Sequence, residues 1–487
     1  MRKKIFAFVL LMLLALPLAL AGCNDKGGYV AGSGKLVDLS AMPEGTAEEY
    51  QYLYEQHPVA TDDEYFGLYG SREYQGHPDS VLLDNGNILV AFPKSHGRAE
   101  TIMMLSTDGG LAYTDIFNAD NPKPDSFYHT EETPTIYKLD FTDGTQKLIT
   151  ISGRPSWADQ PGDKGEGWDA AISASLDENG KCDGLEWSEH ENFYGPNAVR
   201  EEYKREAGAE KYDAVVAMSS LTQMKDENGN LIDKWMGTYH DDRNFTVYKT
   251  FLTFNEEGQM EWSEPVRMLG QNGEWRSYEQ GQVISIGTQM IMIKEGNCFC
   301  ETEIIRSPDG NELAALFRVN SKNNYSFVSF STDEGETWSE PQTMSQELTG
   351  ERHKAEYDPV TGKLVITMRS IHHPQVPDGK QPDNDWVSRG WVAWIGDYED
   401  LKRGADGKGD MLVKLAHTYG TDGTEITEYA NADTGYAGLV VLADGTVVTT
   451  SYGTFSPVGS ELGGKTYVMT KQFKIADLAA VGGVTLR

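Results

Sequence analysis

Cationic side chains recur along the sequence directly after short apolar segments that have the composition of β-strands. They are Lys94, His96, Arg98, Arg154, Arg243, Arg318 and Arg369. The planar fork of a guanidinium binds carboxylates through two parallel hydrogen bonds. If the segments end at one place in the fold, these cations predict a site for an anionic or hydroxyl-rich ligand. The alternative is that each cation lies on a solvated rim.

A turn followed by a strand is the repeated element that must position these cations. Such turns precede apolar runs at Gly86, Gly144, Gly229, Gly310, Gly362 and Gly445. An Asx-Gly pair between apolar runs indicates a β-hairpin, because its central residues need positive φ. The repeats predict an all-β chain whose residues 46–487 form one closed six-bladed β-propeller, with the strands that follow the turns innermost and their ends at the central funnel. A β-sandwich with generic hairpins is the alternative.

The charge balance excludes one class of partner. The 487 residues include 42 Lys and Arg against 75 Asp and Glu, a formal charge of −33. Nucleic acids bind proteins through neutralisation of phosphates by Lys and Arg, so DNA or RNA binding is excluded as a main function. The sequence contains no dinucleotide fingerprint, P-loop or zincin motif, and we expect no cofactor and no metal.

The first residues have the pattern of a bacterial lipoprotein signal. Three basic residues precede an apolar stretch, and residues 20–23 read L-A-G-C. We therefore expect residues 1–22 to be a signal peptide and residues 23–45 to be a lipid-modified Cys23 followed by a flexible tether. The protein would be anchored to a bacterial membrane and face the periplasm or the cell exterior. A plain transmembrane anchor is the alternative.

The remaining cysteines are Cys182, Cys298 and Cys300. They lack the second pair that a structural zinc site needs, so we expect small buried residues. A disulfide between Cys182 and one of the other two is the alternative.

A second motif lies in the loops. Residues 331–338 fit the pattern S-x-D-x-G-x-x-W, and residues 106–113 fit it with Tyr in place of Trp. Degenerate copies occupy residues 175–187 and 253–262. In such a turn the carboxylate accepts backbone N–H groups and the aromatic ring fills the blade, so we expect a structural role. The motif resembles the Asp box, or BNR repeat, of the sialidase superfamily.

Two further segments resemble catalytic segments of that superfamily. Residues 301–318 are similar to the stretch that runs from an acidic residue through an Asp-Gly turn to an arginine. The resemblance implies that Glu301 assists the nucleophile and that Arg318 binds a substrate carboxylate. Residues 436–445 resemble the segment with the tyrosine nucleophile, which implies Tyr436. A phenol avoids repulsion by an anionic sugar, and its pKa of about 10 demands a base such as Glu301.

The other family positions are matched less closely. Residues 389–397 resemble the region of a third arginine, which implies Arg389, with Arg369 as the competing candidate. Where the family has its first arginine the chain reads Y-Q-G-H-P, so either His77, Arg72 or Arg98 compensates or the arginine triad is incomplete.

The family's acid/base aspartate also has no counterpart in register. Glu100 or His96 is the expected substitute. Residues 351–354 read E-R-H-K before another strand, and His353 there fits a rim or a funnel position equally well.

These inferences predict an exo-acting retaining glycoside hydrolase of sialidase type. It would release a terminal sugar, with an acidic one favoured, from extracellular glycans, and act as a monomer. One alternative is a non-catalytic glycan-binding propeller. Another is a divergent propeller glycosidase or lyase that acts on a non-sialic sugar, a lyase or hydrolase of this kind working through His96 and Lys94.

Overall fold

The computed structural model describes most of the chain after residue 28. The described residues are 29–60, 66–67, 70–71, 75–94, 100–129, 132–154, 168–176, 181–182, 184–189, 215–241, 247–268, 283–286, 289–292, 299–319, 325–371, 388–419, 434–455 and 466–487. Residues 1–28, including the predicted signal peptide and Cys23, lie outside them.

The first three blades of a β-propeller are antiparallel sheets with chain-consecutive strands. The first blade is β5 (Asp79–Leu82), β6 (Ile88–Pro93), β7 (Thr101–Ser106) and β8 (Thr114–Asp115). The second is β9 (Glu132–Asp140), β10 (Gln146–Arg154) and β11 (Trp168–Ser175). The third is β12 (Val215–Lys225), β13 (Leu231–Asp241), β14 (Val247–Phe254) and β15 (Met260–Trp262), with β16 (Val266–Arg267) pairing β14.

The last three blades follow the same order, and two of them add a strand from the N-terminal part of the chain. The fourth is β19 (Phe299–Arg306), β20 (Leu313–Val319), β21 (Phe327–Ser331) and β22 (Gln342–Thr343). The fifth is β23 (Gly350–Tyr357), β24 (Leu364–Ile371), β25 (Ser388–Gly396), β26 (Met411–Lys414) and β1 (Lys35–Asp38). The sixth is β27 (Ala437–Val441), β28 (Thr446–Gly453), β29 (Tyr467–Lys474) and β2 (His57–Pro58).

Smaller elements complete the described chain. Two short hairpins pair β3 (Phe66–Gly67) with β4 (Gly70–Ser71), and β17 (Val283–Ile286) with β18 (Gln289–Met292). The α-helices are α1 (Tyr398–Leu401) and α2 (Ile475–Gly482), and the 3-10 helices are η1 (Glu48–Tyr54), η2 (Asp125–His129), η6 (Gln346–Leu348) and η8 (Gly404–Asp406). No helix in the described ranges has the length and apolar character needed to cross a membrane.

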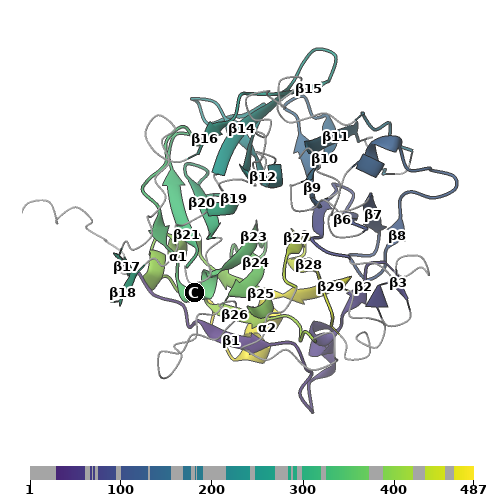
Figure 1. Cartoon of the computed structure of the whole chain (residues 1–487). Helices are drawn as coiled ribbons and strands as arrows, with labels where there is room; N and C mark the ends of the chain where they lie inside the picture. Colours follow the sequence, from purple (N-terminus) through teal and green to yellow (C-terminus); the bar gives the residue numbers. More distant parts are fainter. Residues whose placement is uncertain are drawn as a thin grey trace, which may run out of the picture.

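The sheets form a closed ring around an axis (Figure 1). The first strand of each blade is innermost, and in the order β5, β9, β12, β19, β23 and β27 each contacts the next, with β27 contacting β5 again. The predicted all-β, six-bladed propeller is therefore confirmed. The six predicted hairpin glycines all have positive φ, between 72° at Gly362 and 86° at Gly144.

One detail of the prediction is wrong. The strands that follow the six turns, such as β20 and β24, are second from the axis and not innermost. Because β19 and β20 are antiparallel, the end of β20 lies beside the start of β19. The residues that follow the turn-strand units and the residues that open the inner strands therefore meet at the same end of the ring.

The hydrophobic core is divided among the junctions between neighbouring blades. Six clusters of buried side chains each combine residues of two adjacent sheets. In the cluster between blades three and four, for example, Met236 packs with Phe299 and Phe317. Each blade thus buries both faces, which is why strands such as β6 and β20 are apolar almost throughout.

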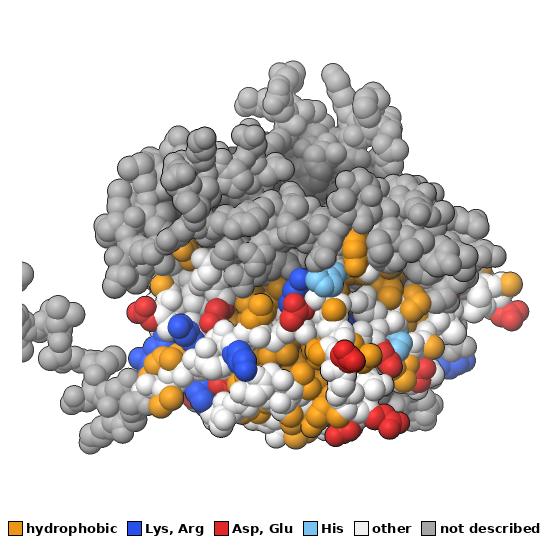
Figure 2. Space-filling model, turned by 90° about the horizontal axis from the view of Figure 1, so that it is seen from below, with side chains coloured by type: hydrophobic (Ala, Val, Ile, Leu, Met, Phe, Trp, Pro, Cys, Tyr) orange, Lys and Arg blue, Asp and Glu red, His pale blue; other side chains and the backbone are white. Residues whose placement is uncertain are grey.

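The two best matches to the S-x-D-x-G pattern form compact turns. The Asp333 carboxylate accepts the Thr337 backbone N–H at 2.9 Å, and the Asp108 carboxylate accepts that of Ala112 at 3.0 Å. Tyr113 is buried between blades one and six, and Trp338 packs between blades three and four. On the side view of Figure 2, acidic and basic side chains are mixed over the described surface.

The N-terminal segment closes the ring from outside. β1 adds to blade five in parallel with β26, and β2 adds to blade six beside β29. Lys471 of β29 is fully buried, and its ammonium donates to the carbonyls of Leu39 and Leu53, both at 2.9 Å. Burial lowers the pKa of Lys471 to about 7, although the negative charge of Asp38 acts in the opposite direction.

Replacing Lys471 with Met should destabilise the ring closure. The change leaves two buried carbonyls without this donor, which costs roughly 1–3 kcal/mol for each, partly offset because no amine is buried any longer. We expect denaturant unfolding to show a loss of about 2 kcal/mol or more. Lys474→Met is the matched control, because Lys474 forms an exposed pair with Asp444 whose removal costs less than about 1 kcal/mol. Equal stability of the two variants would contradict this role.

Candidate functional site

Side chains from four blades meet at the end of the axis where the inner strands begin. The set, which we call the axial cluster, consists of His77, Glu301, Arg318, Glu351, Arg369, Tyr436 and Tyr452. It joins blades one, four, five and six, which lie next to one another only because the ring is closed.

Tyr436 and Glu301 form the centre of the cluster. The Tyr436 hydroxyl donates to Glu301 Oε2 at 3.1 Å and accepts a hydrogen bond from Arg318 Nη1. Arg318 Nη1 also donates to Glu301 Oε2 at 2.5 Å. Glu301 is 3% exposed and Tyr436 is 6% exposed, so this exchange of hydrogen bonds is shielded from water. The structure therefore brings together the three residues that the resemblance names first.

Arg369 and Arg318 share a second carboxylate. Arg369 Nη1 donates to Glu351 Oε2 at 2.9 Å. Arg318 Nη2 lies 3.0 Å from Glu351 Oε1, an ion pair without hydrogen-bond alignment. Glu351 is 0% exposed. Its carboxylate thus bridges the two guanidinium groups within the protein.

The ring of Tyr436 is fixed by its neighbours. The His77 ring centre lies 4.9 Å away, and the Tyr452 ring meets it edge-on at 6.2 Å. The Arg369 guanidinium lies 4.7 Å from the centre of the Tyr436 ring, within cation–π range. Arg369 Nη2 also donates to the Tyr452 hydroxyl at 2.5 Å. These contacts hold the phenol in one orientation toward Glu301.

The backbone is irregular near the starts of the inner strands that supply the cluster. His77, Glu301 and Arg352 have φ of 47°, 25° and 51°, values that residues with a side chain rarely adopt. The pairing register shifts between Cys300 and Thr302, as at a β-bulge. Strained backbone of this kind collects at functional sites, where the surrounding structure holds it in place.

The charges of the cluster set its protonation states. Burial alone would raise the pKa of Glu301, but Arg318 and Arg352 lower it to about 2. Burial raises the pKa of Tyr436 well above its usual value, and Glu301 and Glu351 raise it further against the effect of Arg318. At neutral pH the pair is a phenol that donates to a carboxylate, which is the protonation state that a phenol nucleophile with a carboxylate base requires.

Sequence reasoning did not assign several residues around this pair. The Glu301 backbone N–H donates to His240 Nδ1 at 3.3 Å, and burial lowers the pKa of His240 to about 3. His353 donates from Nε2 to the Leu348 carbonyl at 2.9 Å, and burial lowers its pKa to about 4. Both histidines are neutral and fixed.

Glu351 was also missed, although the sequence contains a signal for it. Glu351 opens the inner strand of blade five and pairs with Arg369 on the next strand. Glu301 opens blade four in the same way, with neighbouring Cys300 paired to Arg318. Two consecutive repeats therefore start with a glutamate and deliver an arginine from the second strand.

The other predicted site residues are only partly described. Glu100 contacts Lys94 at 2.8 Å and Lys123 at 3.4 Å. Burial alone would raise the pKa of Glu100, but these lysines lower it, which disfavours the protonated form that a general acid needs. The acid/base role of Glu100 stays a prediction.

Several predicted residues lie outside the described side chains. Residues 72, 96, 98 and 243 lie outside the described ranges, as does Cys298. Arg154 ends β10 and Arg389 lies in β25, and only their backbones are described. Cys182 and Cys300 are both buried.

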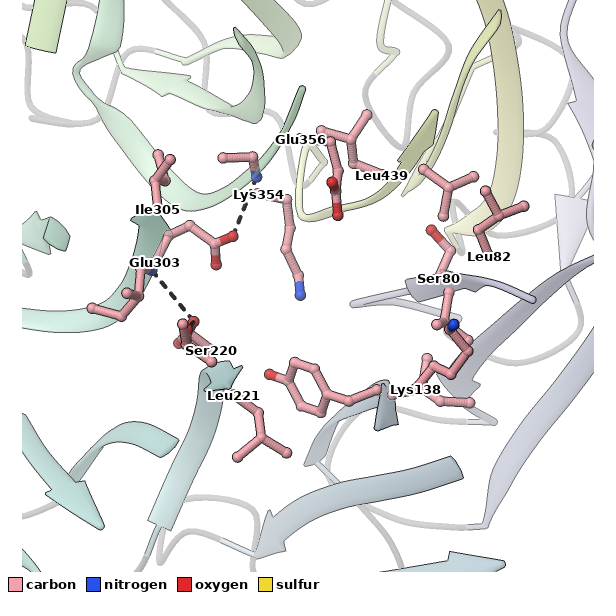
Figure 3. Close-up of a pocket in the computed structure, with 18 of the residues that line it drawn as sticks. Ser80, Leu82, Lys138, Ser220, Leu221, Glu303, Ile305, Lys354, Glu356 and Leu439 are labelled. Atoms are coloured by element: carbon pink, nitrogen blue, oxygen red, sulfur yellow. Dashed lines mark hydrogen bonds between the residues drawn. The ribbon is translucent and has the colours of Figure 1, made fainter. Parts of the chain in front are cut away.

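A cavity of about 460 Å³ follows the axis between the six inner strands (Figure 3). Lys354 points into it and lies 3.2 Å from Asp79 Oδ2. Glu303 accepts the Ala355 backbone N–H at 3.3 Å through Oε1, and its other oxygen is buried without a hydrogen-bond partner. Within the described residues, no three His, Cys, Asp or Glu side chains are arranged to hold a metal ion.

No family model and no curated protein matches the sequence. Solved structures are similar in fold. An α-L-arabinofuranosidase from Fusarium graminearum, in complex with an iminosugar inhibitor, is 11% identical, with 87% of this chain and 98% of that chain covered and a TM-score of 0.50.

Two further solved structures have slightly lower TM-scores. A protein of unknown function from Dyadobacter fermentans is 15% identical (86% and 97% covered, TM-score 0.49). An intramolecular trans-sialidase from Ruminococcus gnavus, in complex with oseltamivir carboxylate, is 12% identical (86% and 99% covered, TM-score 0.47). The chain is a six-bladed propeller, and at such identity its likeness to the arabinofuranosidase extends to the fold alone.

The Glu303 carboxyl should make stability depend on pH. Burial raises its pKa to about 8, although Lys354 opposes this, whereas the unfolded chain has the ordinary value of 4.5. Its contribution to stability is therefore fully present below pH 4.5 and is lost as the pH rises to 8. Glu356 also lines the cavity, but its side chain is exposed there, so the expected pH dependence concerns the buried Glu303.

Glu303→Gln cannot ionise, so it should not lose this contribution as the pH rises. Within that window, the difference in unfolding free energy between the variant and the wild type should change in favour of the variant by up to about 1.4 kcal/mol per pH unit. Urea unfolding at a series of pH values measures the difference. Glu227→Gln, at an exposed turn, is the control and should run parallel to the wild type. A parallel curve for Glu303→Gln would show that Glu303 is not protonated in the folded protein.

Proposed function

We propose that the protein is a retaining glycoside hydrolase that removes terminal sugars from glycans, with Tyr436 as nucleophile and Glu301 as its base. The observation that carries the proposal is the buried hydrogen bond of 3.1 Å from the Tyr436 hydroxyl to an ionised Glu301, with Arg318 bound to both. A phenol paired with a carboxylate in this way is an activated nucleophile. The propeller fold, shared with a glycosidase, is compatible with this chemistry but does not by itself imply it.

The geometry suggests the course of the reaction. The Tyr436 oxygen attacks the anomeric carbon as its proton passes to Glu301, and the bond to the leaving oxygen breaks while that oxygen takes up a proton from solvent. Water then attacks the anomeric carbon and gives up a proton to solvent, the bond between the sugar and Tyr436 breaks, and Glu301 returns the first proton to the phenolate. The positive charge that develops on the sugar ring favours departure of the phenol proton at that moment.

Arg318 and His240 would hold Glu301 for this role. Burial alone would lower the pKa of Arg318, but Glu301 and Glu351 raise it, so the guanidinium stays charged beside Tyr436. Because His240 Nδ1 accepts the Glu301 backbone N–H, this neutral imidazole carries its proton on Nε2. The hydrogen bond to His240 therefore holds the backbone of the base, Glu301, in place.

A glycan-binding propeller without catalysis is the second candidate. The observation that favours it is Glu100, whose two lysine partners lower its pKa and so oppose action as the proton donor to the leaving group. This candidate keeps the same glycan site. It differs in predicting binding without turnover.

Tyr436→Phe and Glu301→Gln should each lower kcat by about 100-fold or more, because each removes part of the activated nucleophile. Hydrolysis of a panel of aryl glycosides, including an α-sialoside and an α-L-arabinofuranoside, is the measurement. Tyr137→Phe, at a half-buried tyrosine of the axial cavity, is the matched control and should keep wild-type kcat.

A fluorinated sugar that traps the covalent intermediate should add its mass to a peptide containing Tyr436 in the wild type only. Full activity of Tyr436→Phe would overturn the assigned nucleophile. Sugar binding by the wild type without turnover on any glycoside would favour the binding protein.

A further inference from the structure

We propose that Glu351 is an internal substitute for a substrate carboxylate, so that the site selects terminal sugars that carry no carboxylate. The inference rests on the proposed function, since it assigns the substrate class of the same site. It departs from the acidic sugar that the sequence favours.

The first step is the geometry of the bridge. Each carboxylate oxygen of Glu351 faces a different guanidinium, Oε1 facing Arg318 at 3.0 Å and Oε2 facing Arg369 at 2.9 Å. Two arginines that converge on one carboxylate are the arrangement that an anionic ligand would need. In this protein the carboxylate they converge on belongs to the chain itself.

The second step is that Glu351 cannot readily give up this place. It is 0% exposed and is cross-strand paired with Arg369, so the sheet of blade five holds it in place. A carboxylate displaced from its arginines would remain buried without a partner, which is strongly unfavourable. A ligand carboxylate would also compete against a group that is already held in position.

The third step is the charge already present beside Tyr436. Glu301 and Glu351 both contact Arg318, and Glu351 also contacts Arg369, so the two guanidinium groups that reach this point each already face a carboxylate of the chain. A sugar carboxylate at this point would be a third anion next to two fixed ones. Like charges brought together without water oppose binding, whereas sugar hydroxyls accept hydrogen bonds from guanidinium groups without adding charge.

The fourth step concerns the tyrosine. A phenol nucleophile avoids repulsion by an anionic substrate, which is the reason the sequence favours an acidic sugar. The same phenol equally avoids repulsion by Glu351, which contributes to raising the pKa of Tyr436. Tyr436 therefore does not require that the substrate bring a carboxylate, because the protein supplies one.

Two sugars that differ only at one carbon test the selectivity. Calorimetric titration of the full chain with D-galactose and with D-galacturonate should show at least about tenfold weaker binding of the acid by the wild type. Glu351→Gln keeps the shape of the side chain but removes its charge. In this variant, binding of galacturonate relative to galactose should strengthen by about tenfold or more. Glu356→Gln, a carboxyl of the axial cavity, is the control and should keep the wild-type ratio.

A second measurement tests the bridge without any sugar. Glu351→Ala leaves the two arginines without their shared anion, so acetate should raise its melting temperature saturably above the value in equal chloride. The wild type and Glu356→Ala should show no such rise.

The inference is overturned if the wild type prefers the acidic sugar, if Glu351→Gln keeps the wild-type ratio, or if acetate leaves Glu351→Ala unchanged. Failure of the proposed function has a different signature. Absence of turnover on every glycoside would reject the hydrolase, while acetate binding to Glu351→Ala and the shifted ratio would still support the role of Glu351.

Discussion

Closure of the ring is the constraint on which the rest of the structure depends. Tyr436 precedes the inner strand of blade six, Glu301 lies in blade four and His77 precedes blade one. These segments are far apart in the chain and become neighbours only because β27 packs against β5 on one side and β23 on the other. The N-terminal strands β1 and β2, with Lys471 bonded to the segment between them, secure this closure from outside.

Closure of the ring also buries several charges at one end of the axis. Arg318 is tied to Glu301, Tyr436 and Glu351, which come from three consecutive blades. Desolvated charges are costly unless each has a close partner, so the arrangement tolerates little displacement. The same partners determine the chemistry, because the arginines keep Glu301 ionised and the buried phenol keeps its proton until it reacts.

The sequence predicted the fold from local physics. Hairpin glycines such as Gly310 and Gly445 need positive φ wherever the chain lies, so the six repeats could be counted without a structure. Glu301, Arg318 and Tyr436 could also be named, because their segments resemble catalytic segments of the sialidase superfamily, and Arg369 could be named because it follows a turn-strand unit. The turn-strand segments are second from the axis and not innermost, and the sequence could not show this because period and apolarity are alike for neighbouring strands that are both buried on two faces.

What the sequence determined by itself is therefore the repeating unit and the residue types that each unit brings to one end of the ring. Only the tertiary structure decided which of those residues touch. Contacts between blades involve Glu351, His240 and Tyr452, each of which touches a residue of a neighbouring blade. The spacing of residues within one repeat cannot predict such contacts. The physical reason is that hydrogen-bonded turns form from neighbours in the chain. Buried ion pairs, by contrast, form from neighbours in space, and these exist only after the sixth blade has met the first.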